Sequence, residues 1–514
     1  MHGSYALSRW LFLRLLGVVY LIAFLSLWVQ IHGLVGADGI LPVGAFLERV
    51  HDALGIGAFR QAPTLLWLGS SDLTLDVLCG LGVALSGALI AGLAPIPTLL
   101  GLWAVYLSLS VGGQTFLSFQ WDTLLLETGF SALVVAPVGW RPRAPTASPP
   151  PSRAGLWLVW LLLVKLMVLS GAVKLLSLDQ TWWRLTALDF HFWTQPLPTP
   201  LAWYAAQLPA WLKKLSILLT YILEIVLPFF VFAGPRGRRA VAVGTAFLML
   251  MIGWTGNYGF FNLLTLVLCL PLVDDAVWRR LVPSLRASRP SPPPSRPPLP
   301  FVGRTRIVLV ALWLGVSALV SVRELARTLP TGTGGPLAAL QKGVEASLLD
   351  WSGPTVLAWI APFRTINGYG LFRSMTTERP EIVVEGSRDG VHWQPYELPW
   401  KPGDPARRPR FVTPHMPRLD WQMWFAALSP RGAEPWLAGL MRGLLEGSPE
   451  VLDLFATDPF PGAPPRYVRL FYYRYRFTTP AEHHATGAWW HRELVGPLTG
   501  PASLDALSFR RHQP

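Results

Sequence analysis

The stretch FLSFQWDTLLLETGF, residues 116–130, places two carboxylates inside a run that otherwise has the composition of a lipid-soluble helix. A charged side chain is costly in the hydrocarbon core of a bilayer, so it is usually kept there for pairing or for function. On a helical wheel Gln120, Thr123 and Glu127 share one face, whereas Asp122 falls near the opposite side. The pattern therefore predicts a helix at the centre of a membrane bundle, with polar partners on two faces.

The composition of the whole chain agrees with a membrane protein. Of its 514 residues 52% are hydrophobic and only 14% are charged, whereas soluble domains are about a quarter charged. The net charge is +13, but the arginines cluster in short loops between apolar runs, which is typical of cytoplasmic loops and argues against nucleic acid as a partner. Cys79 and Cys269 both lie in apolar runs, so we expect neither a disulfide framework nor a thiolate metal site.

Apolar runs about long enough to cross a bilayer recur along the first 322 residues, and we expect them to form a transmembrane helical domain, 1–322. The first run is too long for the apolar core of a signal peptide. The expected segments, about nine in number, lie at about 10–34, 73–93, 96–112, 116–138, 155–176, 215–233, 239–256, 258–273 and 305–322.

The basic loops set the expected orientation. With nine helices counted from a cytoplasmic N-terminus, three basic loops fall on one side, and these include the basic and Pro-rich loops 139–154 and 274–304. Everything after about residue 323 then faces outward, as a connector (323–359) and an extracytoplasmic domain (360–514). The arginines concerned are Arg141, Arg143 and Arg153; Arg236, Arg238 and Arg239; and Arg279, Arg280, Arg286, Arg289, Arg296, Arg304 and Arg306.

The C-terminal region, 360–514, has a different sequence pattern from the apolar runs before it. PEIVVEGSRDGVHWQPYEL (380–398) contains two strand-like runs joined by a polar turn, and RYVRLFYYRYRFTT (466–479) is a further β-prone run. RFVTPHMPRLDWQMWFAAL (410–428) also reads as aromatic and β-prone, whereas EPWLAGLMRGLLEGSPEVLDLF (434–455) has helical spacing. The predicted fold class is thus an α-helical polytopic membrane bundle followed by a β-rich extracytoplasmic domain with one or two helices.

Lys165 and Lys174, both in WLLLVKLMVLSGAVKLL (160–176), are the expected partners of the two carboxylates. Such pairs can be structural and fix the helix register, or they can line a polar cavity that binds a ligand or moves protons. In a packing role Asp122→Asn should be tolerated, and in a chemical role it should abolish activity at normal expression. The full expected intramembrane polar cluster is Gln120, Asp122, Thr123, Glu127, Lys165, Lys174, Glu224, Asn257 and Asn262.

Recognisable catalytic chemistry is missing from the sequence. The outward loop 181–211 is dense in aromatic residues and Pro, and is either an interfacial or re-entrant element or a surface for an apolar client or lipid. His483, His484 and His491 match no zinc spacing, and no phosphate-binding loop, nucleophile elbow or dinucleotide fingerprint is present. We therefore assign no catalytic residue, metal or cofactor.

Six stretches, in order along the chain, resemble the lipase maturation factor family: FLSFQWDTLLLETGF, KLMVLSGAVKL, LTALDFHFWTQPLPTPLAWY, TGNYGFFNLLT, INGYGLFRSMTTERPEIVVEGSRDG and WWHREL. The resemblance reaches from about residue 115 to 494. It implies a membrane protein needed for the folding and assembly of secreted homodimeric lipases, in vertebrates in the endoplasmic reticulum, whose outward C-terminal region is associated with client binding. The chain lacks the glycosylation sequons and tail cysteines of animal members. Its amino-acid composition, rich in Ala, Gly, Pro and Arg, suggests a bacterial member in the plasma membrane.

The leading hypothesis is a non-enzymatic folding or assembly factor for exported proteins, with lipases as clients and the bilayer as its surroundings. The alternative is a membrane enzyme or redox protein whose polar cavity takes a lipid-soluble substrate such as a bound lipid or quinone. Transport of a solute through the helical bundle is a third hypothesis. It is disfavoured because the sequence shows no internal repeat of one half in the other. The candidate contacts for a client or lipid are Trp182, Trp183, His191, Tyr369, Phe372, Arg373, Trp393, Trp489 and Trp490.

Overall fold

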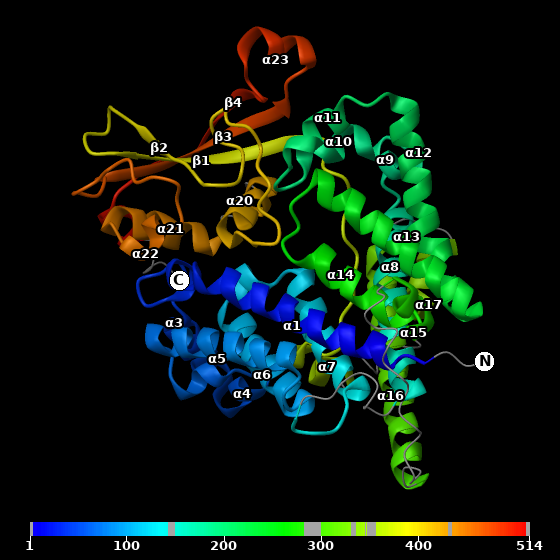
Figure 1. The fold of residues 1–514 in the computed structure, drawn as a ribbon. Helices are drawn as coiled ribbons and strands as arrows, with labels where there is room; N and C mark the ends of the chain where they lie inside the picture. The colour runs from blue at the N-terminus through cyan, green and yellow to red at the C-terminus, as the bar shows by residue number, and fades with distance from the viewer. Residues whose placement is uncertain are drawn as a thin grey trace.

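The computed structural model describes residues 4–141, 150–281, 300–329, 336–344, 346, 356–429 and 434–509 (Figure 1). Parts of the expected connector 323–359 and much of the loop 274–304 lie outside these ranges. So do four of the arginines used to predict the orientation, Arg143, Arg286, Arg289 and Arg296.

Six helices among the described residues are long and apolar enough to cross a membrane, or up to seven if the bent pair Phe261–Leu272 and Asp275–Leu281 counts as one span. Helix α12, Ala210–Tyr221, continues through a π turn (η5, Ile222–Val226) and a 3₁₀ segment (η6, Leu227–Phe232) to make one of the six. The other five are α1 (Ala6–Trp28), α5 (Asp72–Ala91), α6 (Pro95–Gly112), α8 (Arg153–Leu176) and α16 (Pro300–Thr328).

The expected count of nine spans is not confirmed, and helix length gives the reason. Segment 116–138 forms α7, Gln120–Val135, of 16 residues, and segment 258–273 forms α14, Phe261–Cys269, of 9 residues. Both are shorter than the ~20 residues that cross a bilayer. Segment 239–256 lies in α13, Gly234–Thr255, whose first turns carry three arginines. The nine apolar segments of the sequence thus correspond to six or seven candidate spans among the residues that the structure describes.

Shorter helices fill the turns between these elements. The first long connection contains α2 (Ile31–Val35), α3 (Val43–Leu54) and α4 (Ala58–Gln61). The aromatic loop 181–211 folds into α9 (Gln180–Trp183), α10 (Ala187–Thr194) and α11 (Pro200–Ala206), followed by α12. Two of its helices, α10 and α11, lie beside the C-terminal sheet at the top of Figure 1, so the loop belongs to the end of the bundle that carries the tail.

Basic residues gather at the other end of the bundle. The Asp275 carboxylate, from α15 (Asp275–Leu281), accepts hydrogen bonds from the first backbone N–H groups of α1. Arg239 of α13 pairs with Asp274, and the Ala94 N–H donates to the Trp140 carbonyl at 3.1 Å. These contacts bring the described parts of the three basic loops to the same end, as the loop charges predicted.

The C-terminal region contains a four-stranded antiparallel sheet in the order β2-β1-β3-β4. The strands are β1 (Arg379–Ser387), β2 (Gln394–Tyr396), β3 (Tyr467–Phe477) and β4 (Trp490–Ala502). In register, Val384 faces Tyr396 of β2 and Leu470 of β3. The strands predicted at 380–398 and 466–479 are confirmed, and so are the helices predicted at 434–455, which are α21 (Pro435–Glu446) and α22 (Pro449–Leu452).

The prediction of a β-prone run at 410–428 is wrong for its second half. Residues 418–428 form helix α20, Arg418–Leu428. Pro414 and Pro417 interrupt any strand before it, since proline cannot donate to a ladder. The helix packs against β1 and against the bundle and is buried on nearly every side, so burial overrides the β-propensity of its aromatic residues. With α23 (Pro480–Thr486) and α24 (Leu504–Phe509), the region holds more helix than expected.

Bundle and C-terminal region share one hydrophobic core. Trp121 of α7 meets Trp421 of α20 edge-on with ring centroids 4.7 Å apart, and Phe116 meets Trp436 of α21 at 5.7 Å. All four side chains belong to the same buried cluster. The C-terminal region is therefore packed onto the bundle and is not tethered to it by a linker alone.

Candidate functional site

Asp122 is bound by a side chain from the far end of the chain. Its two carboxylate oxygens accept hydrogen bonds from both terminal nitrogens of Arg418, at 2.6 and 2.8 Å, and one also accepts the Tyr106 hydroxyl at 2.6 Å. Both members of the ion pair are buried. Burial opposes the charge on Arg418, but Asp122 outweighs it, so the pKa of the guanidinium is raised. The paired fork is the strongest geometry available to a carboxylate and an arginine.

Glu127 faces the other side of α7, as the helical wheel predicts. Lys165 of α8 donates to one of its oxygens. The other oxygen accepts the Tyr369 hydroxyl at 2.7 Å and the Asn367 backbone N–H at 2.9 Å. Lys165 also lies 5.2 Å from the centre of the Tyr369 ring. Of the two expected lysines, Lys165 therefore does pair with a carboxylate of α7.

The segment 364–370, RTINGYG, lies along the same helix. Its Gly370 N–H donates to the Gln120 side chain at 3.1 Å, and the Asn367 amide donates to the Thr123 carbonyl at 3.2 Å. Arg364 donates to the Leu117 carbonyl at 3.0 Å. Segment 364–370 thus supplies backbone and side-chain partners to a helix whose first turn has no side-chain cap.

Lys174, the second expected partner, does not reach α7. It pairs with Glu224 at 2.7 Å and donates to the Ser170 carbonyl, while its ammonium lies 5.4 Å from the Trp182 ring. Glu224 lies in the π turn η5, a departure from α geometry that is frequent at functional sites. The expected polar cluster is therefore three separate groups, one around each acid.

The two asparagines have different surroundings. The Asn257 side chain donates to the Leu197 and Arg410 carbonyls and accepts the Val412 and Thr413 N–H groups. It therefore joins two loops, one before helix α11 and one before helix α20. Asn262 is buried, and its amide has no hydrogen-bond partner among the described residues.

The candidate contact residues divide by exposure. Trp182, Tyr369 and Trp490 are buried core residues, so a client cannot touch them in this conformation. Trp183 is 55% exposed, and Arg373 is exposed and lies 3.6 Å from Glu324. Those partly exposed are Phe372, His191, Trp393 and Trp489.

His191 is held neutral inside the aromatic loop. Its ring lies 4.7 Å from that of Phe372, and burial, together with the charge of Lys174, lowers the pKa of the imidazole to about 4. The sequence analysis names His191 as a candidate contact for a client or lipid. A neutral ring packed against Phe372 is the environment of a packing residue.

The chemistry that this site can perform is limited, because its carboxylates are already occupied by ion pairs and hydrogen bonds. Each of the three carboxylates of the expected polar cluster, Asp122, Glu127 and Glu224, has a cation as partner, and Asp122 and Glu127 have further donors. A general base or a proton carrier needs an acid whose charge is free to change. The sequence analysis did not predict Arg418 and Tyr106 as partners of Asp122, or Asn367 as a partner of Glu127. A lone arginine inside the apolar run RLDWQMWFAAL was the signal that could have identified the first.

Comparison with known proteins adds a second line of evidence. Residues 7–280 match the family model of the lipase maturation factor transmembrane domain, and residues 365–500 match that of the lipase maturation factor C-terminal domain. Lipase maturation factor 2 of Mus musculus and that of Homo sapiens are each 38% identical over 98% of this chain and 84% of their own length. Lipase maturation factor 1 of Mus musculus is 32% identical over 98% of this chain and 88% of its own.

No solved structure is significantly similar to the chain. The family models cover both the helical part and the region of the small sheet, and they include Asp122, Glu127, residues 365–370 and Arg418. The relatives match at more than 30% identity over most of their length. The chain, a multi-pass membrane protein, therefore belongs to the lipase maturation factor family.

Proposed function

We propose that this protein is a membrane-bound folding and assembly factor for exported proteins, and that its first clients to test are lipases. In this proposal the basic end of the bundle faces the cytoplasm and the C-terminal region faces outward, in the plasma membrane of a bacterium. The C-terminal region holds a client that is not yet folded or assembled close to the membrane until the client has buried its own apolar surface. Family membership supports the general role, and the arrangement of the two ends supports the orientation.

The observation that carries client contact is the free edge of the sheet. β4 is the last strand in the order β2-β1-β3-β4, so its outer backbone groups are unpaired within the sheet. Its second half is interrupted by Pro497 and Pro501, which block pairing, but residues 490–496 contain no proline. An extended client segment could add to such an edge by backbone hydrogen bonds, as in other proteins that bind extended peptides.

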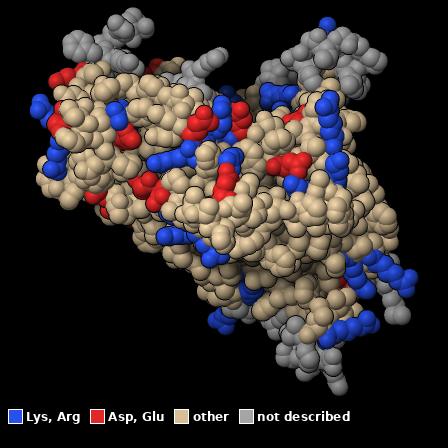
Figure 2. All heavy atoms as spheres, turned by 90° about the horizontal axis from the view of Figure 1, so that it is seen from above, with Lys and Arg blue, Asp and Glu red and all other residues tan. Residues whose placement is uncertain are grey.

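Two apolar side chains mark the same stretch. Leu494 is 54% exposed and Val495 is 52% exposed, and Val495 is the extra residue of a bulge between the partners of Tyr472 and Tyr473. Over the face seen in Figure 2, acidic and basic side chains are interspersed among uncharged ones. A surface of this kind favours an apolar, extended client over a highly charged one.

The bundle chemistry supports binding in preference to catalysis. The acids that could serve an enzyme are held in ion pairs. Two of them also bind the C-terminal region: Asp122 pairs with Arg418, and Glu127 accepts the Tyr369 hydroxyl. Such contacts fix the position of the sheet relative to the membrane. A client held at β4 would then be presented at a constant height above the bilayer.

The test uses the full-length chain expressed in cells that lack their own maturation factor and that secrete a lipase dependent on one. The wild-type chain should restore secreted lipase activity and crosslink to the lipase in native membranes. Leu494→Asp with Val495→Asp should lower the crosslinked fraction by about fivefold or more, since burial of an interface anchor is worth over ~1 kcal/mol. Val391→Asp, at a position 73% exposed on the β1–β2 connection, is the control and should behave as wild type.

The two parts of the proposal fail separately. If the wild-type chain leaves lipase activity at background, the maturation role toward that lipase is wrong. If activity is restored and the β4 double variant crosslinks as well as wild type, the role stands and the β4 contact is wrong. A lipid or quinone that copurifies with the wild type and is lost in Asp122→Asn at unchanged protein level would instead favour the enzyme alternative.

A further inference from the structure

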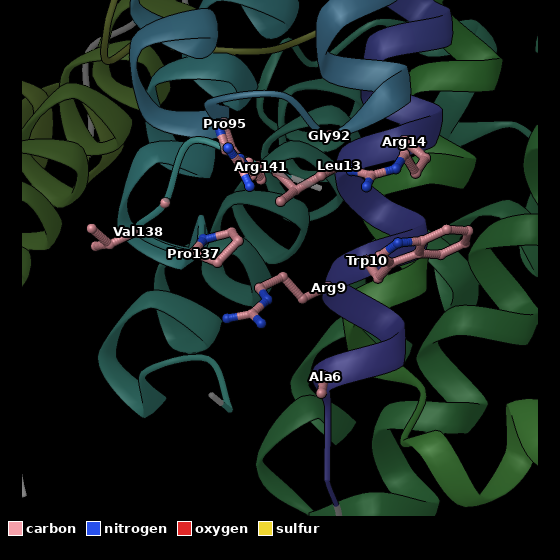
Figure 3. A pocket seen from close by; sticks show the side chains of 11 residues that line it. Ala6, Arg9, Trp10, Leu13, Arg14, Gly92, Pro95, Pro137, Val138 and Arg141 are labelled. Atoms are coloured by element: carbon pink, nitrogen blue, oxygen red, sulfur yellow. The ribbon is translucent and has the colours of Figure 1, made fainter. Parts of the chain in front are cut away.

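A hollow at the basic end of the bundle is separate from every contact described so far (Figure 3). The empty space between its walls, open solvent included, amounts to about 410 Å³. The first turns of α1, the turn between α5 and α6, and the chain that follows α7 line it. Its side chains that matter here are Arg9, Trp10, Arg14, Pro137 and Arg141. Three cations and no acid lie among the lining residues.

Arg9 is the unusual member of this set. It is only 4% exposed, yet its guanidinium makes no hydrogen bond or ion pair with any residue of the described ranges. The charge of Asp275 acts on Arg9 electrostatically, but that carboxylate already accepts three backbone N–H groups of α1. Figure 3 shows the Arg9 side chain turned away from α1, toward the segment with Pro137 and Val138.

The two other arginines differ in whether their guanidinium groups have hydrogen-bond partners. Arg14 donates to the Leu89 and Ala91 carbonyls at the end of α5, at 3.3 and 3.4 Å, and lies 5.1 Å from the Trp10 ring. The Arg141 side chain, like that of Arg9, has no hydrogen-bond or ion-pair partner in the part of the chain that the structure describes. A buried guanidinium without an acid is unfavourable unless an anion supplies the missing bonds.

The walls of the hollow are apolar. Trp10, Leu13, Pro95, Pro137 and Val138 form most of it, and Val138 is itself largely exposed next to the opening. The opening lies at the end of α1, α5 and α6, where these helices leave the expected hydrocarbon layer. Basic pockets between helices at this depth suit the phosphate of a lipid headgroup, with the acyl chains along the outer apolar surface.

We infer that this hollow is a phosphate site, with Arg9 and Arg141 as the groups that bind the anion and Arg14 as a structural neighbour. The ligand chemistry is a phosphate oxyanion held by guanidinium groups. It comes either from an anionic phospholipid or from a free phosphate. The inference concerns the basic end and is independent of the client contact proposed at β4.

Full-length protein in nanodiscs tests the site. Discs of phosphatidylcholine are compared with discs that also contain phosphatidylglycerol, and retained lipid is counted by native mass spectrometry after release into detergent. The wild type should retain phosphatidylglycerol, and Arg9→Gln should lower the retained fraction by about fivefold, as expected for one arginine at an anionic surface. Arg236→Gln removes an exposed arginine at the same end that does not line the hollow, so it should retain as much as wild type.

Thermal unfolding in phosphatidylcholine discs, with and without inorganic phosphate, separates the two sources. A rise in Tm with phosphatidylglycerol alone assigns the site to a lipid, and an equal rise with inorganic phosphate assigns it to the free anion; both must vanish in Arg9→Gln. That variant leaves no partner unpaired, so it should fold with an unchanged or higher Tm in neutral discs. Equal lipid retention by wild type and Arg9→Gln, or an equal loss in Arg236→Gln, would overturn the inference.

Discussion

Arg418 and Asp122, 296 positions apart in the sequence, form a buried ion pair with two parallel hydrogen bonds of 2.6 and 2.8 Å. The pair joins helix α20 of the C-terminal region to the first turn of α7. A carboxylate that is costly inside a bundle is thereby neutralised by a residue from outside it. The two carboxylates of residues 116–130 are accordingly explained by docking of the tail and by a partner helix.

This geometry reverses the expectation that Asp122→Asn is harmless in a packing role. The substitution leaves the Arg418 guanidinium buried without an acid, which costs about 3–5 kcal/mol. Asp122→Asn and Arg418→Gln should each lower the Tm of detergent-purified protein substantially. The double variant should recover much of the loss, because it leaves no unpaired charge. Additive losses in this double-mutant cycle would contradict a structural pair.

The Tyr369 hydroxyl offers a test of the second carboxylate. Tyr369→Phe removes one hydrogen bond to Glu127 while keeping the ring beside Lys165. A hydrogen bond to a charged group contributes about 1.5–3 kcal/mol, so denaturant unfolding should show a loss of that size. Tyr467→Phe in β3 is the control, since the Tyr467 hydroxyl bonds to none of the described residues. Equal losses in the two variants would mean that the hydroxyl bond contributes nothing particular.

His415 makes stability fall in acid. Burial, and then the charge of Arg418, lowers the pKa of His415 from 6.5 to about 4. Between these values the unfolded chain binds more protons, so this contribution is present above about pH 6.5 and is lost as the pH falls toward 4. It amounts to about 3 kcal/mol. His415→Asn can keep the bond to the Ser26 hydroxyl and should flatten the acid part of the Tm curve.

Asp420 gives the control of opposite sign. Burial raises the pKa of its carboxyl from 3.8 to about 6. The folded state therefore binds more protons between these values, and stability from Asp420 is lost as the pH rises through 6. Asp420→Asn can still accept the Trp400 and Lys401 N–H groups, and it should make the loss toward acid steeper than in wild type. Identical pH curves for both variants would contradict these assignments.

Local patterns in the sequence predicted local structure well. The period of α7 predicted its two polar faces, the strand-like runs predicted β1 and β3, and the loop charges predicted a common basic end. The partner of Asp122 could not be predicted in this way, because nothing within a few residues of Arg418 records which acid it meets. Helix α20 was misread for a related reason: its aromatic residues favour a strand in isolation, and only contact with β1 and α7 makes a fully buried helix favourable.

A substitution at Gly33 tests whether the C-terminal region is packed closely against the bundle, at the contact between α2 and α22. A methyl group on Gly33 of α2 would lie 2.2 Å from the Glu450 carbonyl oxygen of α22 and 2.8 Å from the Leu454 side chain. Because backbone cannot move away cheaply, Gly33→Ala should separate the two helices and cost about 1–3 kcal/mol. Gly87→Ala in α5, where a methyl group meets nothing within 4 Å, should be neutral or slightly stabilising. If thermal unfolding cannot distinguish the two variants, α22 does not rest on α2 in the folded protein. The docking of the tail would then depend on its other contacts with the bundle, which include the Arg418–Asp122 ion pair and the packing of Trp121 against Trp421.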